Sequence, residues 1–525
     1  MRRHTTWLLL LILLLPISAG ALNPEEMTGK VMYHEAIQAY EKALSQAKDD
    51  SERGAIHREM GYVYVRAEKF IEAGKEFFLA LSSGALFPPG ERVTMAKYMA
   101  WGDMVPEAAE ELRSITSKYP ENVKAHILLG RYLSWIGNYE ESIRQADLAL
   151  LEDPGNREAL LVKGDSLRWS GKIKAAADIY KMILEDKEDF NARLGLAYTY
   201  IEQGLPYTAK KDIEPLIPQY PYQEKAMAGI REALEKMSRP NLSSSYSIYN
   251  DSDDNRLKSL GFGYRFFAGN FQSKFDYTHV EAEDPLRDAR SELISMETII
   301  PLSSPVSIIA GAGLTVLNNG NRRNEFTFEG TFRWSFNRGN ARLTASRGVF
   351  TDTAELIEKG VRYTGGGGEI DLDLSDRITS SLKYHYRDYS DDNSSNRISG
   401  EIAYTLQRET PGLNGGYRIE YLDFRRESGS GYFDPSNFLS HRLFLALSTS
   451  WNGALLYLEP FGGFESFKRG GQNVDEFIGG GYASFSVSLS ESVSLEIRGE
   501  GGNFSLDTSS GFNYYQLGAS ITARF

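Results

Sequence analysis

Two pairs of closely spaced carboxylates are the residues of this chain best suited to chemistry. Asp371 and Asp373 are two positions apart, and Glu496 and Glu500 are four apart, in segments where apolar and polar residues alternate. On a strand this spacing places both members of a pair on one face. A glycoside hydrolase positions its acid and its base across the substrate. The spacing therefore favours groups that bind a polar molecule over groups that catalyse.

No other arrangement in the sequence indicates catalysis. The histidines His279, His385 and His441 fall in different segments without an adjacent nucleophile, and the chain has no cysteine. We therefore expect no enzymatic activity, no cofactor and no metal site. The alternating segments place further charged residues on the same polar face, namely Glu401, Glu420, Arg418 and Arg498. Mixed charge on one face is compatible both with solvated walls held by ion pairs and with groups that guide a translocating polar chain.

The elements that carry these residues have a period of two from Leu242 to the end of the chain. The last segment places six apolar residues on one face: Tyr515, Leu517, Ala519, Ile521, Ala523 and Phe525. An amphipathic strand that ends at a C-terminal Phe is typical of the closing strand of a membrane β-barrel, in which apolar residues face lipid and polar residues face the lumen. Taken alone, this segment could also be a strand of a soluble sheet.

The connections between the alternating segments point to a barrel. Eight long polar connections, among them residues 281–288, 351–359, 427–437 and 469–475, alternate with seven short ones, which predicts sixteen strands, with fourteen still possible. An even number places both ends of the barrel on one side. Four consecutive glycines, residues 365–368, fall within one strand, where they allow a bend or give room to the lumen.

The N-terminal half has a different period. Small residues recur at steps of 35, 34, 34 and 33 in two series that lie twelve residues apart: Gly61, Ala96, Gly130, Gly164 and Ala197, and Ala73, Ala108, Ser142, Ala176 and Ala209. This is the signature of the tetratricopeptide repeat, in which small residues let paired helices approach closely. The pattern predicts an array from about residue 28 to residue 238. It consists of a leading partial unit, five full units and a closing cap.

Two tryptophans repeat with this period. Trp135 and Trp169 are 34 residues apart, each followed two positions later by a glycine. The simpler interpretation is that each packs at the end of the first helix of its unit. The alternative is a row of aromatic side chains on the array surface that contacts a sugar chain or a protein partner.

The chain begins with an apparent export signal. Arg2 and Arg3 precede an apolar run from Trp7 to Ile17, and small residues follow. We expect residues 1–21 to be a signal peptide, residues 22–238 a periplasmic repeat array and residues 239–525 an outer-membrane barrel. The net charge of −13 argues against nucleic acid as a partner.

The order of signal peptide, tetratricopeptide array and barrel ending in Phe525 resembles the outer-membrane export porins of exopolysaccharide secretion, of which the poly-N-acetylglucosamine porin is one type. The segment from Trp135 to Tyr139 is similar to repeats found beside YaiO-type barrels. The resemblance implies a fold class of an all-α tetratricopeptide-repeat solenoid followed by an antiparallel outer-membrane barrel. It also implies that the repeats recruit periplasmic or inner-membrane export and synthase proteins, while a polysaccharide chain leaves through a lumen gated by long outer loops.

Two other functions fit the same order of elements. Surface lipoprotein assembly modulators also join a periplasmic tetratricopeptide domain to a barrel, there of fourteen strands, and act on proteins. A structural or receptor barrel without a transport role is the third possibility.

Overall fold

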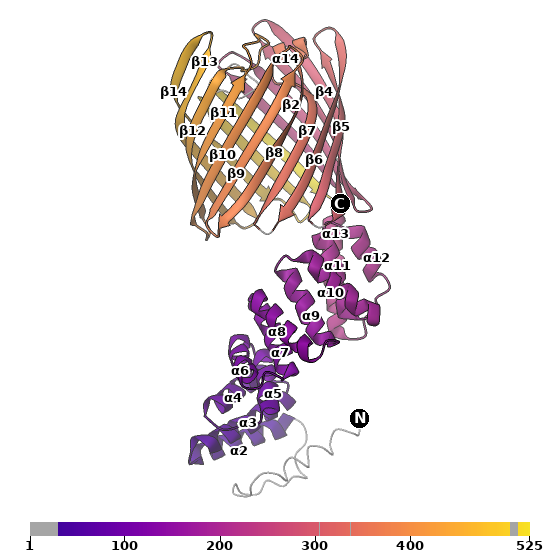
Figure 1. The fold of residues 1–525 in the computed structure, drawn as a ribbon, viewed down its shortest axis with the longest axis vertical. Coiled ribbons are helices and arrows are strands. Elements are labelled where there is room, and N and C mark those ends of the chain that lie inside the picture. The colour runs from indigo at the N-terminus through magenta and orange to yellow at the C-terminus, as the bar shows by residue number, and fades with distance from the viewer. Residues whose placement is uncertain (1–29, 304, 337, 504–512) are drawn as a thin grey trace. The chain divides into compact units, whose positions relative to one another are not determined.

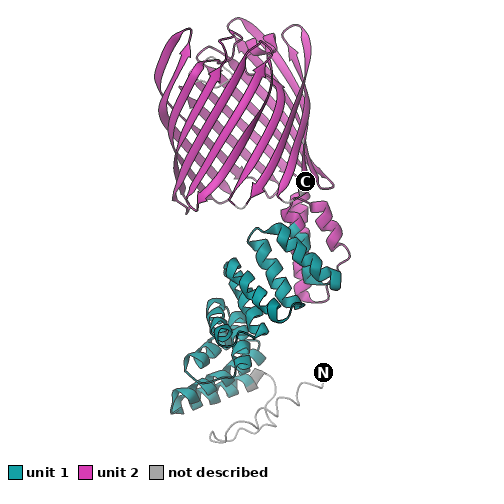
Figure 2. Ribbon diagram, in the orientation of Figure 1, with its two compact units in different colours: residues 1–199 teal, residues 200–525 magenta. Residues whose placement is uncertain are grey.

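The computed structural model describes residues 30–303, 305–336, 338–503 and 513–525. The expected signal peptide, residues 1–21, lies outside the described residues. The chain divides into two compact units, residues 1–199 and 200–525 (Figure 2). This division falls within a helix and does not test the domain boundary expected at residue 238. No helix among the described residues is long and apolar enough to cross a membrane.

The helices follow one another in antiparallel pairs (Figure 1). Their order matches the predicted array: one leading helix, five pairs and a closing helix. The bounds are α2 Lys30–Gln46, α3 Asp50–Arg66, α4 Phe70–Ser82, α5 Pro89–Trp101, α6 Val105–Lys118, α7 Val123–Trp135, α8 Tyr139–Glu152, α9 Arg157–Trp169, α10 Ile173–Asp186, α11 Phe190–Glu202, α12 Pro206–Ile213 and α13 Pro221–Ser238.

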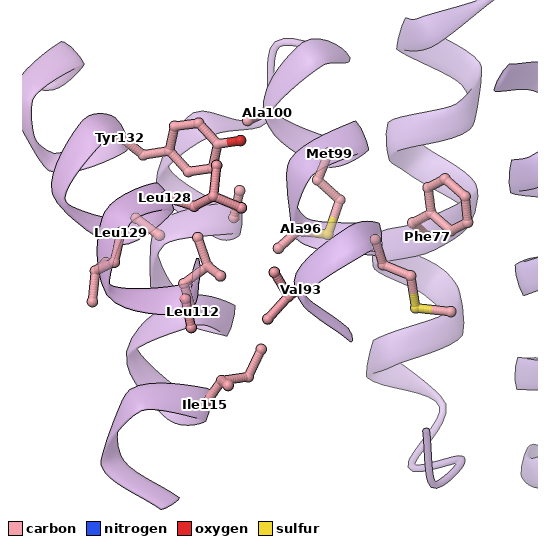
Figure 3. Close-up of a cluster of buried hydrophobic side chains, with 14 of the residues drawn as sticks. Phe77, Val93, Ala96, Met99, Ala100, Leu112, Ile115, Leu128, Leu129 and Tyr132 are labelled. Carbon is pink, nitrogen blue, oxygen red and sulfur yellow. The ribbon is translucent and has the colours of Figure 1, made fainter. Parts of the chain in front are cut away.

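The small residues of the two series lie where helices cross. Ser142 of α8 is fully buried and donates a hydrogen bond of 2.6 Å to the carbonyl oxygen of Gly130 on α7. A Cβ on Gly164 would lie 2.8 Å from the ring of Tyr180, which is too close for a real contact. Side chains from successive helices then fill the space between them, as Phe77, Met99 and Leu129 do in Figure 3. Close approach at the small residues is thus what lets neighbouring helix pairs stack on one another.

The strands form one closed antiparallel barrel, in which β1 pairs with β16. The prediction of sixteen strands is confirmed. Their bounds are β1 Asn241–Asp251, β2 Arg256–Ala268, β3 Phe271–Asp284, β4 Arg287–Ser303, β5 Val306–Asn318, β6 Arg322–Phe336, β7 Gly339–Val349, β8 Arg362–Ser375, β9 Ile378–Tyr389, β10 Ser394–Gln407, β11 Gly412–Phe424, β12 Ser436–Trp451, β13 Ala454–Arg469, β14 Gln472–Ser488, β15 Val493–Gly502 and β16 Tyr514–Arg524.

Two of the eight connections expected to be long are tight turns. Residues 285–286 alone join β3 to β4, and Gly470 and Gly471 alone join β13 to β14. Both glycines have positive φ, as a two-residue hairpin turn requires. The polar residues around these turns extend the strand ladders beyond the apolar part of the wall, and their polarity reflects exposure to water. The longest connections in the described part of the chain are residues 350–361, which contain the short helix α14 (Ala354–Lys359), and residues 425–435.

Candidate functional site

The polar face of the strands is the inner face of the barrel. Tyr389, Phe424 and Phe467 share a strand face with the charged residues of β9, β11 and β13, and all three belong to one packed cluster with Phe350 at the end of β7. Side chains from such widely separated strands can converge only on the concave side of a closed wall. The registers place all eight candidate residues on this inner face. Glu401 lies opposite Arg418, for example, and Glu496 lies opposite Ser520.

Four of the eight candidate residues surround one cavity on the inner wall. Asp371, Glu401, Arg418 and Glu420 line a cavity of about 450 Å³ between β7 and β12. Arg418 is held by two carboxylates, since it forms 2.6 Å ion pairs with both Glu401 and Glu459. Its guanidinium also lies 4.1 Å from the centre of the Phe444 ring. Arg418 is thus fixed as a bridge across the strands that carry its two partners.

A second network lies beside the first. Arg342 forms ion pairs with Asp371 at 3.0 Å and Glu369 at 3.4 Å, and Lys383 pairs with Glu369 at 2.8 Å. Opposite charges on neighbouring strands therefore neutralise one another along this wall. The interpretation of the charged face as ion-paired walls holds for these strands.

The remaining four candidates are not brought to this cavity. Glu496, Arg498 and Glu500 lie together on β15, where Glu500 accepts a 2.7 Å hydrogen bond from the hydroxyl of Tyr514. No ion pair involves Asp373, Glu496 or Arg498 in the described part of the chain. The pairing of Asp371 with Asp373 and of Glu496 with Glu500 as binding groups is not tested by these contacts and stays a prediction.

Two acidic residues of the networks were not among the predicted residues. Glu369 holds Arg342 and Lys383, and Glu459 holds Arg418. Both lie in segments whose alternation is blurred, in one by the glycines of residues 365–368 and in the other by Pro460 and the glycines that follow it. Strand pairing resolves their register where the sequence pattern does not.

Two connections fold inwards at the barrel mouth that lies away from the C-terminus, and we call them the cover; Figure 1 labels α14 of the first of them. Residues 350–361 carry α14 towards β3, β4 and β5, where Ala354 and Ile357 are fully buried against Ala282, Ala289 and Leu317. Residues 425–435 bring Tyr432 and Phe433 into a second cluster with aromatic residues at the ends of β7, β9, β11, β12 and β13. Apolar packing therefore anchors both connections to the inner wall.

Charged contacts hold the cover in place. Arg287 at the start of β4 forms ion pairs with Glu355 at 3.5 Å and Glu358 at 2.8 Å. Lys359 donates a 2.7 Å hydrogen bond to the carbonyl oxygen of Gly429, which joins the two covering segments. Thr353 caps α14 by accepting a hydrogen bond from the amide of Leu356. The segment is thus a structured cover with several anchors.

The two tryptophans of the repeat array lie on its surface. Trp135 is 52% exposed and Trp169 is 42% exposed, so neither is a buried core residue. Both line a cavity of about 390 Å³ with residues of α7, α9 and α11, and Arg168 lies 5.4 Å from the ring of Trp169. Trp101 at the end of α5 is also 49% exposed and precedes Trp135 by the same 34 residues. The repeat step could have identified this third member. What the row contacts stays a prediction.

A half-buried carboxyl is among the groups that line this cavity. Asp165 accepts a 2.5 Å hydrogen bond from the hydroxyl of Tyr180. Burial raises the pKa of Asp165, while the hydrogen bond from Tyr180 and the charges of Arg168 and Arg131 act in the opposite direction. No group of side chains suited to hold a metal ion is found in the described residues.

Comparison with known proteins yields similarity of fold only. No protein-family model matches the chain, and no curated protein matches it. Among solved structures, one described as a bacterial polysaccharide outer membrane secretin is 12% identical, with 55% of this chain and 98% of that chain covered at a TM-score of 0.44. CdiB from Acinetobacter baumannii is 10% identical, with coverage of 55% and 60% and a TM-score of 0.37. A tetratricopeptide repeat protein from Parabacteroides merdae is 18% identical, with coverage of 40% and 88% and a TM-score of 0.32.

Proposed function

We propose that this chain is an outer-membrane channel that passes a secreted polysaccharide through a hydrated lumen, with its helical repeats in the periplasm. The observation that carries the proposal is the contrast between the two faces of the barrel. The inner face holds paired charges and hydroxyl groups, whereas the outer face is apolar on strand after strand. A water-soluble barrel would have the opposite arrangement.

The outer face supports insertion into lipid. Large apolar side chains stand about half exposed around the wall, including Leu443 at 67%, Leu343 at 63% and Phe326 at 57%. Soluble proteins rarely expose contiguous apolar patches larger than a few hundred Å². Because the strands close into a ring, the apolar surface has no edge, and a bilayer is the partner that covers such a ring completely.

Aromatic residues support a defined depth in the membrane. Phe271 and Trp451 flank short turns, and Trp334 lies near the end of β6, all at the barrel end that holds Asn241 and Arg524. Their side chains are 48%, 48% and 47% exposed. Aromatic rings at one height are typical of the girdle at a membrane interface. With the covered mouth at the other end, this arrangement favours short turns and helical repeats on the periplasmic side.

The lumen supports a polar cargo. Sixteen strands enclose enough space for an aqueous channel. Ser243, Ser245 and Ser247 of β1 and Ser520 and Thr522 of β16 contribute hydroxyl groups to the inner face. Such groups exchange hydrogen bonds with a sugar chain without holding it tightly. The strand count also departs from the fourteen strands of the lipoprotein assembly modulators, so no feature of the barrel favours protein as the cargo.

The exposed aromatic row of the repeat array supports a binding role for that region. Concave faces of stacked helix pairs commonly bind partners. In this proposal the array recruits the periplasmic or inner-membrane export and synthase proteins that deliver the polymer.

Deletion of the gene tests the proposed function. We expect the deletion strain to lose its cell-surface polysaccharide, to accumulate polymer in the periplasm and to recover secretion when the full chain is supplied. A control chain with Leu286→Ala, a change at an exposed residue of the turn between β3 and β4, should restore secretion. Normal polysaccharide secretion by the deletion strain would contradict the proposal.

A further inference from the structure

A small basic cavity lies on the inner wall directly beneath the covered mouth. Its volume is about 190 Å³. Three strands and the end of β7 supply its lining: Phe350, Lys383, His385, Arg387, Tyr389, Ser395, Arg397, Ser399, Glu420, Leu422 and Phe424. Three side chains with permanent positive charge thus face one carboxylate, and the histidine adds a further nitrogen donor. We call this cavity the basic pocket.

The cations of the basic pocket differ in how they are neutralised. Lys383 pairs with Glu369 at 2.8 Å, and Arg397 lies 3.6 Å from Glu420. Arg387 has no ion pair in the described part of the chain, and its guanidinium lies 4.7 Å from the centre of the Tyr363 ring. Arg387 therefore brings to the pocket a positive charge that is not engaged in an ion pair with any described side chain.

The four-glycine run lets β8 lie close to the strand that carries two of these side chains. Gly365 and Gly367 of β8 lie opposite Arg387 and His385 of β9 on the inner face. A Cβ on Gly365 would lie 2.2 Å from the carbonyl oxygen of Tyr386, and one on Gly367 would lie 2.4 Å from the carbonyl oxygen of Tyr384, in both cases closer than any side-chain atom of Arg387 or His385. Any larger residue would therefore first disturb the pairing of β8 with β9, on which the position of the basic side chains depends.

Aromatic rings separate the basic pocket from the outside. Phe350, Tyr389 and Phe424 line it on one side and are each about 5% exposed, packed beneath Tyr432 of the covering segment. The ring centres of Tyr389 and Tyr432 are 5.1 Å apart. Charge interactions beside such buried rings are stronger than in open solvent. The pocket is therefore suited to an anion that arrives from the lumen.

We propose that the basic pocket binds an acidic group, such as a carboxylate, carried by the polymer in transit. This inference rests on the proposed function and deepens it, because it assigns an acidic polysaccharide as the cargo. Arginine binds carboxylates through two parallel hydrogen bonds, and His385 and the hydroxyls of Ser395 and Ser399 supply further donors. The pocket is then the last polar contact of the polymer before the apolar cover.

The test is calorimetric titration of the purified full chain in detergent with three probes: hexagalacturonate, which is acidic, maltohexaose, which is neutral, and inorganic phosphate. We expect hexagalacturonate to bind with an affinity that falls as salt is added, and maltohexaose to bind at least tenfold more weakly. Arg387→Gln should lower the affinity for hexagalacturonate by about tenfold. Arg387 is suited to this change because its removal leaves no carboxylate without a partner.

Arg265→Gln is the matched control. Arg265 also lies on the inner face without an ion pair in the described residues, but it is on β2, seven strands away around the barrel. We expect this variant to bind hexagalacturonate as the unchanged protein does. Heat-dependent migration on gels reports whether each variant keeps a folded barrel.

Three results would overturn the inference: equal affinity for the acidic and neutral oligosaccharides, equal losses in the Arg387 and Arg265 variants, or phosphate binding as tight as that of hexagalacturonate. The last would assign the pocket to a free anion instead of a polymer. Each of these results leaves the proposed function intact, because that function is tested by secretion in the deletion strain.

Discussion

Gly164 on α9 is a single residue on which the packing of the repeat array depends. A Cβ at this position would lie 2.8 Å from the ring of Tyr180, which is fully buried. We expect Gly164→Ala to destabilise the helical region by about 1–3 kcal/mol, as overpacking of a filled core does. Gly155→Ala is the control, since nothing lies within 4 Å of a Cβ at that turn position. Urea unfolding, followed by circular dichroism at a wavelength where helices absorb, measures the free energy of unfolding of both variants. Equal stability of the two variants would contradict this explanation.

Asp165, the next residue, makes the stability of the repeat array depend on pH. Burial raises its pKa, so the folded state binds the proton more tightly than the unfolded state does. The stability that this proton contributes is fully present below the unfolded pKa of about 3.9 and is lost as the pH rises through the folded pKa.

Asp165→Asn tests this dependence, because the amide oxygen can still accept the hydrogen bond of Tyr180 without a charge. We expect the variant to lose less stability than the unchanged protein between pH 4 and pH 7. Glu158→Gln, a change at an exposed carboxylate of the same helix, should keep the original profile. Parallel profiles for the Asp165 variant and the unchanged protein would show that the Asp165 carboxyl does not set the pH dependence.

Alternation in the sequence is enough to place a residue on the inner face, as it does for Glu401 and Arg418, which pair at 2.6 Å. It does not identify partners on strands that are far apart in sequence. Glu459 binds Arg418 from a segment interrupted by proline and glycine, and only the closed strand order brings the two together. Predicting a contact between them requires the register of every strand in between.

At the scale of elements, the cover of the barrel mouth is the feature with the clearest consequence. Ile357 of α14 is fully buried against Ala282, Ala289 and Leu317. We expect Ile357→Asp to release α14, because an unpaired buried charge costs several kcal/mol. Conductance of the reconstituted full chain in a planar bilayer should then rise several-fold above that of the unchanged protein.

Leu286→Asp is the matched control for the cover. Leu286 is 84% exposed in the turn between β3 and β4, close in sequence to the anchor Arg287 but outside the packed cluster. Its replacement should leave the conductance unchanged. If the Ile357 variant conducts no more than the Leu286 variant, α14 does not close the channel.

The elements that were mispredicted share one cause. Residues 281–288 and 469–475 are polar and were expected to be loops, yet most of them continue strand ladders. Polar composition marks contact with water, and strands that extend beyond the apolar wall meet water as loops do. Conversely, residues 351–359 and 427–437 were expected as outer loops. The inward packing of these connections depends on Phe350, Tyr432 and Phe433, whose role is set by tertiary contacts.

At the scale of the whole molecule, the regular periods of the sequence predicted the architecture. A step of 34 residues predicted five helix pairs, and a period of two with alternating turn lengths predicted sixteen strands. Both patterns arise because each element has to present one kind of residue to one environment at every repeat. The basic pocket and the cover have no such period, and so they became visible only in the folded chain.

In the proposed function, lipid surrounds the barrel and water fills it. Substitutions in the closing strand β16 test both statements at once. Ala519 and Ser520 are adjacent small residues, and Ala519 is the more exposed of the two. The chain has no native cysteine, so Ala519→Cys and Ser520→Cys each introduce a unique thiol.

The measurement is the rate at which a charged, water-soluble thiol reagent labels each variant in native membranes opened to the periplasmic side, with the denatured proteins as references. We expect Ser520→Cys to be labelled and Ala519→Cys to be protected despite its greater exposure, because only lipid can shield it. Faster labelling of Ala519→Cys, or equal rates at both positions, would show that the barrel is not a lipid-embedded channel.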